Sequence, residues 1–324
     1  MIKRILAAAL VAVVGLGMAL DGGAGAEAAG MRSRSAASVF RGGLYVQPDG
    51  AAATAAASLS GAQRTAARYI ARRSVAIWLT EWATGTTLSD YVGTITAAAD
   101  AAGRTAVFVA YALPDRDCGG GQSAGGLGSA AAYLSWTRTL AGALSGHRAV
   151  LLLEPDSLAT IDACSASTAS SRIPLLRRAV RLYARAGVPV YLDGAMSGYE
   201  SVATAAARLK RAGVASARGF FTNVANYRGT AAERRWATRL SRATDDAHYV
   251  IDVGRNGQGY QEEWCNALGA GLGRDPRVVR GDARLDALLW VKPPGASDGS
   301  CNGGPSAGSW YPAYALRLYR NRAG

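Results

Sequence analysis

Short apolar runs alternate along the chain with longer, amphipathic stretches. Seven runs, most of them rich in Val, Ile, Leu, Phe and Tyr, lie at 74–79, 106–112, 149–153, 189–192, 219–222, 249–253 and 287–291. Most of them show no clean alternation of apolar and polar positions, which is typical of strands that are buried on both faces of a sheet. We therefore expect seven buried strands.

The stretches between these runs carry the pattern of helices. They lie at 88–102, 127–144, 174–186, 199–212 and 230–244, and glycine directly follows three of them, as a helix stop signal would. Alternating strands and helices indicate a parallel sheet with helical crossovers. Because there are about seven such units and no internal linker or repeat, we predict an α/β fold, a TIM-like (β/α) barrel, in a single domain over residues 40–324.

Polar side chains follow these strands, at the point where each strand ends. They are Asp117, Glu154, Asp156, Asp193, Asn223, Arg255, Asn256, Lys292 and Asp298. Any one of them could serve as a helix cap or a turn residue. In a barrel, however, the carboxyl ends of all strands converge on one face, where active sites form. The repetition over six units therefore predicts a functional site on that face.

The first residues have the pattern of an export signal. Lys3 and Arg4 precede an apolar run of 16 residues, 5–20, and Ala26-Glu27-Ala28 has the small residues of a cleavage site. The run is shorter than the ~20 residues of a membrane-spanning helix, although an N-terminal membrane anchor is the alternative. We expect residues 1–28 to be a secretory signal peptide and 29–39 a short linker. The mature protein is then extracellular, with no membrane partner.

The four cysteines fit an exported chain. An even number of cysteines in such a chain indicates two disulfides, for which the sequence allows three pairings. No two of them lie two to four residues apart, as in most structural zinc sites, so we expect no metal. The net charge of +13 comes almost entirely from Arg spread over helix faces. Because no basic block is interleaved with aromatics, we predict no nucleic-acid partner.

Two strand ends carry the chemistry. One segment runs from Tyr111 to Asp117 and Cys118, and the other contains Glu154 and Asp156. Hydrolysis of an acetal requires a protonated carboxyl for the leaving oxygen and a carboxylate that activates water or attacks carbon. When two carboxyl groups are neighbours, their pKa values move apart, so that one group stays protonated near neutral pH while the other is ionised. The alternatives are structural: an Arg partner for Glu154, which we favour there, and a salt bridge from Asp117 to Arg116.

The same segments resemble the glycoside hydrolase family 6 cellulases. Tyr111 and Arg116-Asp117-Cys118-Gly119, followed by Gly125-Gly126, are similar to one family signature, and 151–158 to the other. The resemblance continues in family order through 40–46, 191–194, 223–227, 251–257, 263–265 and 289–299. It therefore covers essentially the whole predicted domain.

The resemblance implies a site and a mechanism. Asp156 would be the general acid, Asp117 would raise its pKa, and Asp298 would be the candidate base. Tyr111 would press on the sugar ring beside the cut. Trp78, Trp264 and Lys292 would line glucose subsites, with Asp193, Asn223 and Asn226 as polar neighbours. The family also implies a modified seven-stranded barrel, inversion at the anomeric carbon, no cofactor, and the disulfides Cys118–Cys164 and Cys265–Cys301.

The chain also departs from the family pattern. Ala296, Met196 and Ala225 stand where the family usually has Glu, His and Ser. The loops are short, which favours an open cleft over a tunnel. We predict a secreted, monomeric, inverting endo-β-1,4-glucanase that acts on cellulose or a related β-glucan. A glucan-binding homologue without catalysis and a cellobiohydrolase are alternatives. A serine hydrolase, suggested by G-x-S-x-G at 121–125, lacks the strand and helix that this motif needs directly beside its Ser.

Overall fold

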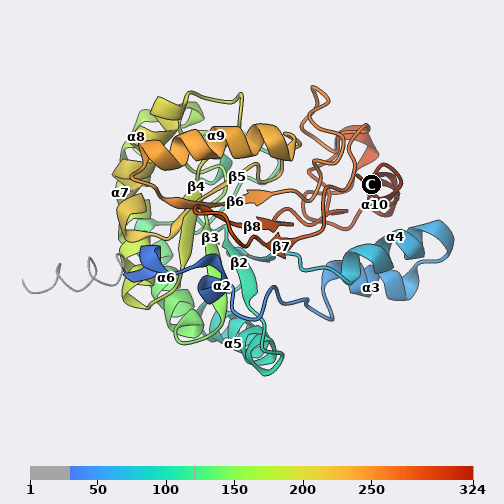
Figure 1. Cartoon of the computed structure of the whole chain (residues 1–324), viewed down its shortest axis with the longest axis horizontal. Coiled ribbons are helices and arrows are strands. Elements are labelled where there is room, and N and C mark those ends of the chain that lie inside the picture. The colour runs from blue at the N-terminus through green and yellow to red at the C-terminus, as the bar shows by residue number, and fades with distance from the viewer. Residues whose placement is uncertain (1–29, 120, 324) are drawn as a thin grey trace, which may run out of the picture.

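The computed structural model describes residues 30–119 and 121–323, so the predicted signal peptide lies outside the described residues (Figure 1). Its centre is one sheet with the strand order β1-β2-β3-β4-β5-β6-β8-β7. Seven strands are parallel: β1 (Ile77–Leu79), β2 (Ala106–Ala110), β3 (Ala149–Leu153), β4 (Val190–Asp193), β5 (Gly219–Thr222), β6 (His248–Asp252) and β8 (Leu285–Leu289). The short β7 (Arg277–Val278) is antiparallel to β8.

The sheet curls until its two sides meet. The backbone N–H of Ala76, just before β1, donates to the carbonyl of Trp290, just after β8, at 2.9 Å. The indole of Trp78 adds a bond of 2.8 Å to the carbonyl of Val291. The barrel is thus joined at this seam by two hydrogen bonds rather than by a strand ladder. The predicted seven-stranded, TIM-like α/β architecture is confirmed.

Alternate residues of each strand enter two different cores. In β3, Val150 and Leu152 pack inside the barrel, whereas Leu151 and Leu153 pack outward against the helices. The outer layer consists of α5 (Gly85–Ala101), α6 (Ala130–Leu144), α7 (Ala166–Arg185), α8 (Val202–Ala212) and α9 (Thr230–Ala243). Because both strand faces are buried, the strands read as continuous apolar runs.

Helix α7 is longer than its sequence pattern predicts. It begins at Ala166, where the hydroxyl of Ser165 accepts a hydrogen bond from the N–H of Thr168. Pro174 lies inside the helix, although the sequence pattern places it at the start, where proline is most favourable. The serine cap, not the proline, marks the beginning of this helix.

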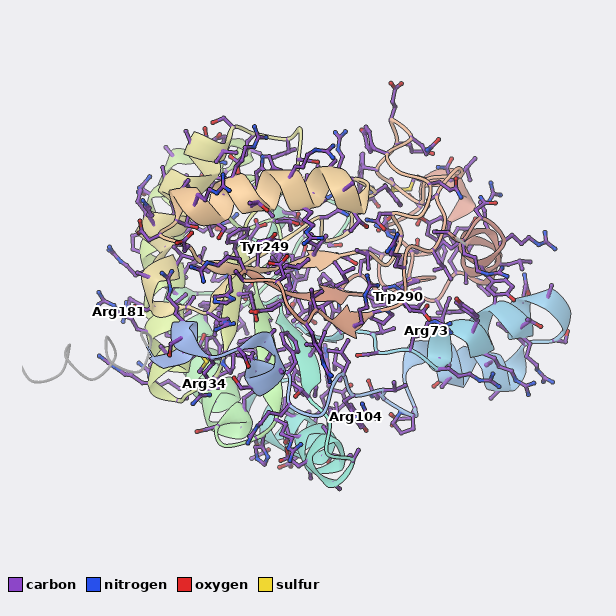
Figure 2. The ribbon with its side chains drawn as sticks, in the orientation of Figure 1. Arg34, Arg73, Arg104, Arg181, Tyr249 and Trp290 are labelled. Atoms are coloured by element: carbon purple, nitrogen blue, oxygen red, sulfur yellow. A yellow bond between two sulfur atoms is a disulfide. The ribbon has the colours of Figure 1, made fainter. Side chains whose placement is uncertain are left out.

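Two helices that the pattern did not predict precede the barrel. Helices α3 (Ala51–Ser58) and α4 (Gly61–Ala71) pack on each other and extend away from the barrel beside α10 (Pro312–Arg320) (Figure 1). Arg73, just after α4, pairs with Asp275 and lies 5.9 Å from the ring of Trp290 (Figure 2). Alanine has the highest helix propensity, but the Ala-rich α3 carries no clear apolar stripe to reveal it.

The N-terminal segment (residues 30–39) packs on the barrel, whereas the sequence predicts a linker there. It includes α2 (Ala36–Val39), and Val39 is buried in the inner core. The guanidinium of Arg218 is fully buried and donates to the carbonyls of Met31 and Arg34, both at 2.7 Å. Arg218 also holds both carboxylate oxygens of Asp286 at 2.8 Å. This ion pair fixes the segment to the end of the barrel opposite the strand carboxyl ends.

Within 30–119 and 121–323, no helix is long and apolar enough to cross a membrane.

Candidate active site

The loop after β3 carries the predicted acid. The chain turns sharply there, and both Glu154 (φ 53°) and Asp156 (φ 67°) adopt left-handed backbone conformations. Such conformations are unfavourable for non-glycine residues and cluster at functional sites. The carboxylate of Asp193 holds the turn, because it accepts the N–H groups of Leu158 (3.1 Å) and Ala159 (3.0 Å). Asp193 is therefore buried beneath the loop and supports Asp156.

Asp156 has the electrostatic environment of a proton donor. Burial raises the pKa of its carboxyl to about 8, and the negative charges of Asp193 and Asp117 act in the same direction. The ammonium group of Lys292 opposes the shift, and Asp298 adds to it more weakly. An Asp with this pKa keeps its proton at neutral pH and can donate it.

Asp117 lies in the loop after β2, close enough to Asp156 to act on its pKa. One of its oxygens accepts a hydrogen bond from the hydroxyl of Tyr111 at 3.0 Å, and the other accepts the N–H of Ser123 at 3.1 Å. The alternative salt bridge to Arg116 does not form. Arg116 pairs instead with Glu81 at 2.7 Å and lies over the Tyr111 ring at 4.3 Å.

Glu154 is structural, as expected, but its predicted Arg partner is wrong. Its carboxylate accepts the N–H groups of Ala112 and Leu113, all at 3.1 Å, and no Arg of the described chain forms an ion pair with it. Burial raises the pKa of Glu154 to about 7. These bonds tie the end of β3 to the end of β2, and so fix the two acidic loops relative to each other.

Asp298 is a buried anion with several donors. Its Oδ2 accepts from Arg255 (2.7 Å), from the N–H of Asn266 (2.9 Å) and from the hydroxyl of Tyr227 (3.3 Å), while its Oδ1 lies 3.2 Å from Nζ of Lys292. Burial raises the pKa of Asp298, but Arg255 and Lys292 outweigh it and hold the pKa below its ordinary value. Asp298 is therefore a carboxylate at neutral pH.

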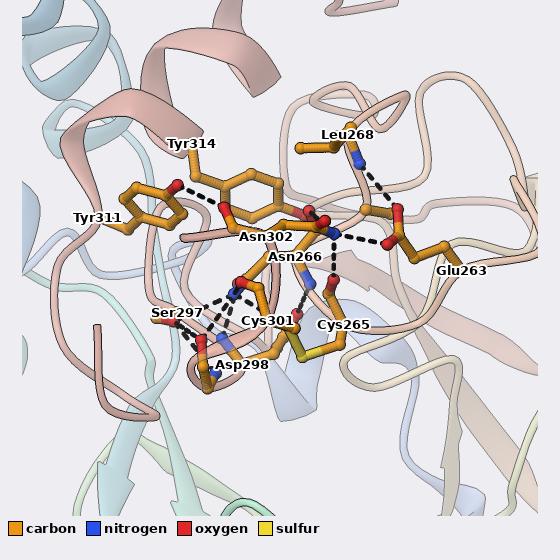
Figure 3. Close-up of a disulfide and its surroundings, with 12 residues drawn as sticks. Glu263, Cys265, Asn266, Leu268, Ser297, Asp298, Cys301, Asn302, Tyr311 and Tyr314 are labelled. Carbon is orange, nitrogen blue, oxygen red and sulfur yellow. Dashed lines mark hydrogen bonds between the residues drawn. A yellow bond between two sulfur atoms is a disulfide. The ribbon is translucent and has the colours of Figure 1, made fainter. Parts of the chain in front are cut away.

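The loop of Asp298 is clamped from one side (Figure 3). Asn266 donates its N–H to the Asp298 carboxylate, and its side-chain oxygen accepts the N–H of Asp298 at 2.8 Å. Its amide nitrogen donates to the carbonyls of Gly299 and Cys301. The Cys265–Cys301 disulfide joins the same two loops. This pairing and Cys118–Cys164 confirm the predicted disulfides.

An open cleft of about 550 Å³ leads to the acids. Its lining includes Trp78, Tyr111, Lys292 and Trp310. Trp78 stands edge-on to Tyr111 with ring centres 5.1 Å apart. Asp117, Glu154 and Asp156 surround an adjoining cavity of about 10 Å³. Aromatic faces beside carboxyl groups suit a sugar ring that is held against an acid.

The remaining predicted residues differ in position. Trp264 is 57% exposed in the loop after β6, and Asn226 is partly exposed. Asn223 is fully buried, and its side chain bonds the backbone of Arg228 and Asp252. Asn223 therefore shapes the loop after β5 and exposes no group to a ligand.

Sequence patterns missed Tyr199. It lies in the loop after β4 and is 50% exposed. Burial raises the pKa of its hydroxyl, followed by the charge of Asp156, so the ring lies near the acid. The sequence pattern places Tyr199 at the start of a helix, whereas α8 begins at Val202. The feature of the sequence that could have pointed to Tyr199 is an aromatic residue six positions after Asp193.

Described residues include no cluster of three His, Cys, Asp or Glu side chains that could hold a metal ion. The arrangement that is present combines a raised-pKa acid, a second carboxylate and an aromatic cleft at the carboxyl ends of barrel strands. This is the combination of groups that acid–base hydrolysis of a sugar acetal requires.

Comparison with known proteins gives the family. The model of "Glycosyl hydrolases family 6" matches residues 41–322, and the chain belongs to that family. It is 39% identical to Endoglucanase A of Cellulomonas fimi over 86% of this chain and 61% of that protein. This chain thus spans less than two thirds of the Cellulomonas protein. Endoglucanase 1 of Streptomyces halstedii is 35% identical over 85% of this chain and 88% of its own length.

Solved structures agree. The endoglucanase Cel6 from Mycobacterium tuberculosis, in complex with methyl-cellobiosyl-4-deoxy-4-thio-β-D-cellobioside, superposes with a TM-score of 0.81 at 36% identity. The match covers 86% of this chain and 96% of the other. The predicted family resemblance is confirmed.

Proposed function

We propose that this protein is a secreted, inverting endo-β-1,4-glucanase that hydrolyses internal bonds of cellulose or a related β-glucan. The observation that carries the proposal is the position of Asp156. Its carboxyl, with a pKa raised to about 8, lies among Asp117, Asp193 and Lys292 next to an aromatic cleft. Endoglucanase relatives at 35–39% identity support the same substrate class.

The proposed reaction is a single displacement. Asp156 donates its proton to the glycosidic oxygen as the bond to the anomeric carbon breaks. Water attacks that carbon from the opposite face and gives up a proton, for which Asp298 is the proposed base. The charges of Arg255 and Lys292 make Asp298 a weak base, but they also fix its orientation. Asp117 keeps the pKa of Asp156 high and accepts the hydroxyl of Tyr111.

Substrate contacts follow from the same geometry. Tyr111 would press on the ring at the cut, while Trp78, Lys292 and Trp264 line neighbouring subsites, with Asn226 at the edge. Tyr199 would contact the sugar next to Asp156. We propose that Asp193 and Asn223 act only as supports.

The test measures viscosity and reducing sugar together on carboxymethylcellulose, for the wild type and for Asp156→Ala. A fast fall in viscosity with the wild type, and a loss of at least ~100-fold in turnover with the variant, is the expected result. Reducing sugar released with little loss of viscosity would indicate a cellobiohydrolase, the activity named for a relative from Aspergillus niger at 29% identity. No release on this substrate or on amorphous cellulose would refute the hydrolase.

A further inference from the structure

The exposed large apolar side chains are not scattered over the described surface. Apart from Val46, they are Trp82, Tyr199, Tyr260, Trp264 and Leu268. All five lie in loops that follow β1, β4 or β6, and so on the carboxyl-end face that carries the acids. Single exposed apolar residues need no explanation, but a set confined to one face marks a binding surface.

Trp82 belongs to this set but has no role in the proposed reaction. It lies in the loop between β1 and α5 and is 55% exposed. Its ring stands edge-on to Tyr91 with centres 5.2 Å apart. Tyr91 in turn lines the 550 Å³ cleft, as do Thr80 and Trp78. The aromatic surface therefore continues from Trp78 in the cleft, through Tyr91, to Trp82 at the rim.

Both chain neighbours of Trp82 are fixed. Glu81 pairs with Arg116 and accepts the N–H of Gly126 at 3.1 Å, which ties this loop to the one that carries Asp117. The carbonyl of Ala83 accepts a buried hydrogen bond of 2.8 Å from the indole of Trp136. A large ring held on a fixed backbone loses little conformational entropy when a ligand covers it.

We propose that Trp82, backed by Tyr91, is an outlying sugar platform at the end of the cleft. Its ligand is a pyranose ring of a β-1,4-linked glucan, beyond the ring that Trp78 contacts. The flat apolar face of a glucose unit packs on an indole face, and the extended glucan chain carries its next units along the cleft. This inference rests on the proposed function for its substrate class. It predicts that only longer chains reach Trp82.

The experiment measures kcat and KM on cello-oligosaccharides of three to six glucose units. Trp82→Ala should raise KM for cellohexaose about 3- to 10-fold, the scale of one aromatic stacking contact, with kcat unchanged. KM for cellotriose should not change. Trp82→Leu keeps an apolar contact with Tyr91 but has no flat face, so it should behave like Trp82→Ala, whereas Trp82→Phe should recover most of the affinity. Val46→Ala, an exposed apolar side chain outside this set, is the matched control and should leave every KM unchanged.

Binding separates this proposal from the proposed reaction. Calorimetric titration of cellohexaose into Asp156→Ala, with and without Trp82→Ala, measures the platform without turnover. A lower affinity of the double variant for cellohexaose supports the platform even if the wild type proves inactive. Equal affinity of the two proteins for cellohexaose, or a KM increase that is the same for cellotriose and cellohexaose, would overturn it.

Discussion

Replacing Arg255 with Met leaves Asp298 as a buried carboxylate without its shortest charged contact. The side chains of this pair are 1% and 5% exposed. Removing one partner from such a buried pair lowers the free energy of unfolding by about 3–5 kcal/mol, because the other charge stays desolvated. Lys292 and the N–H of Asn266 remain beside Asp298, so we expect the free energy of unfolding to fall by about 3 kcal/mol, near the lower end of this range.

The matched control is Arg73→Met. The Arg73–Asp275 pair has the same chemistry, but its carboxylate is 57% exposed, so its loss should cost at most about 1 kcal/mol. The assay is urea unfolding followed by tryptophan fluorescence, for the wild type and both variants at pH 7.

The pH dependence gives a second criterion. The wild-type pKa of Asp298 is lowered, so its contribution to stability is present above the ordinary Asp pKa and is lost as pH falls through the folded value. Without Arg255, burial dominates and the pKa of Asp298 rises, so protonation of Asp298 in acid removes its buried charge and stabilises the folded variant. The difference in free energy of unfolding between the wild type and Arg255→Met should therefore become smaller between pH 7 and about pH 4. Two results would refute the assignment of Asp298 as a charge held by Arg255. One is an equal fall in the free energy of unfolding for Arg255→Met and Arg73→Met, and the other is a difference between Arg255→Met and the wild type that does not change with pH.

Three further outcomes are expected. The wild-type rate on soluble β-glucan should fall as pH rises through about 8, where Asp156 loses its proton, and Asp117→Asn should move this limb to lower pH by removing a negative charge; a pH–rate profile with an unmoved limb would contradict the coupling. Asn266→Ala should lower kcat about tenfold and leave KM for cello-oligosaccharides within about twofold, because it frees the loop of Asp298 without changing the cleft. A change confined to KM would contradict the role of Asn266 in positioning this loop. Arg218→Met should lower the free energy of unfolding by about 3–5 kcal/mol in urea, while the exposed Arg34→Met should change it little; similar values for both would show that the buried pair is not the anchor.

The strands and the acids were predictable for the same reason. A strand such as 149–153, buried on both faces, reads as an unbroken apolar run, and the first polar side chains after it mark the carboxyl-end face. Asp156 and Asp117 could thus be placed on one face without any knowledge of their contacts.

The partners of these groups could not be predicted from the same pattern. Arg116 bonds Glu81, 35 residues away, rather than its neighbour Asp117. Asn266 and Asp298 are 32 residues apart and meet only through the paths of two long loops. Hydrophobic periodicity contains no information about such loop paths, and nothing in it distinguishes the buried Asn223 from the partly exposed Asn226.

The attachment of the N-terminal segment has a consequence for the order of folding. Met31 meets Arg218 across 187 residues of chain, and Arg218 is itself held by Asp286 on β8. Contacts of such long range form late, because the loop between the partners must close first. The first residues of the domain can therefore dock only after its last parallel strand is in place. Protease resistance of residues 30–39 should accordingly be the last to appear during refolding, which makes this segment a reporter of a completed barrel.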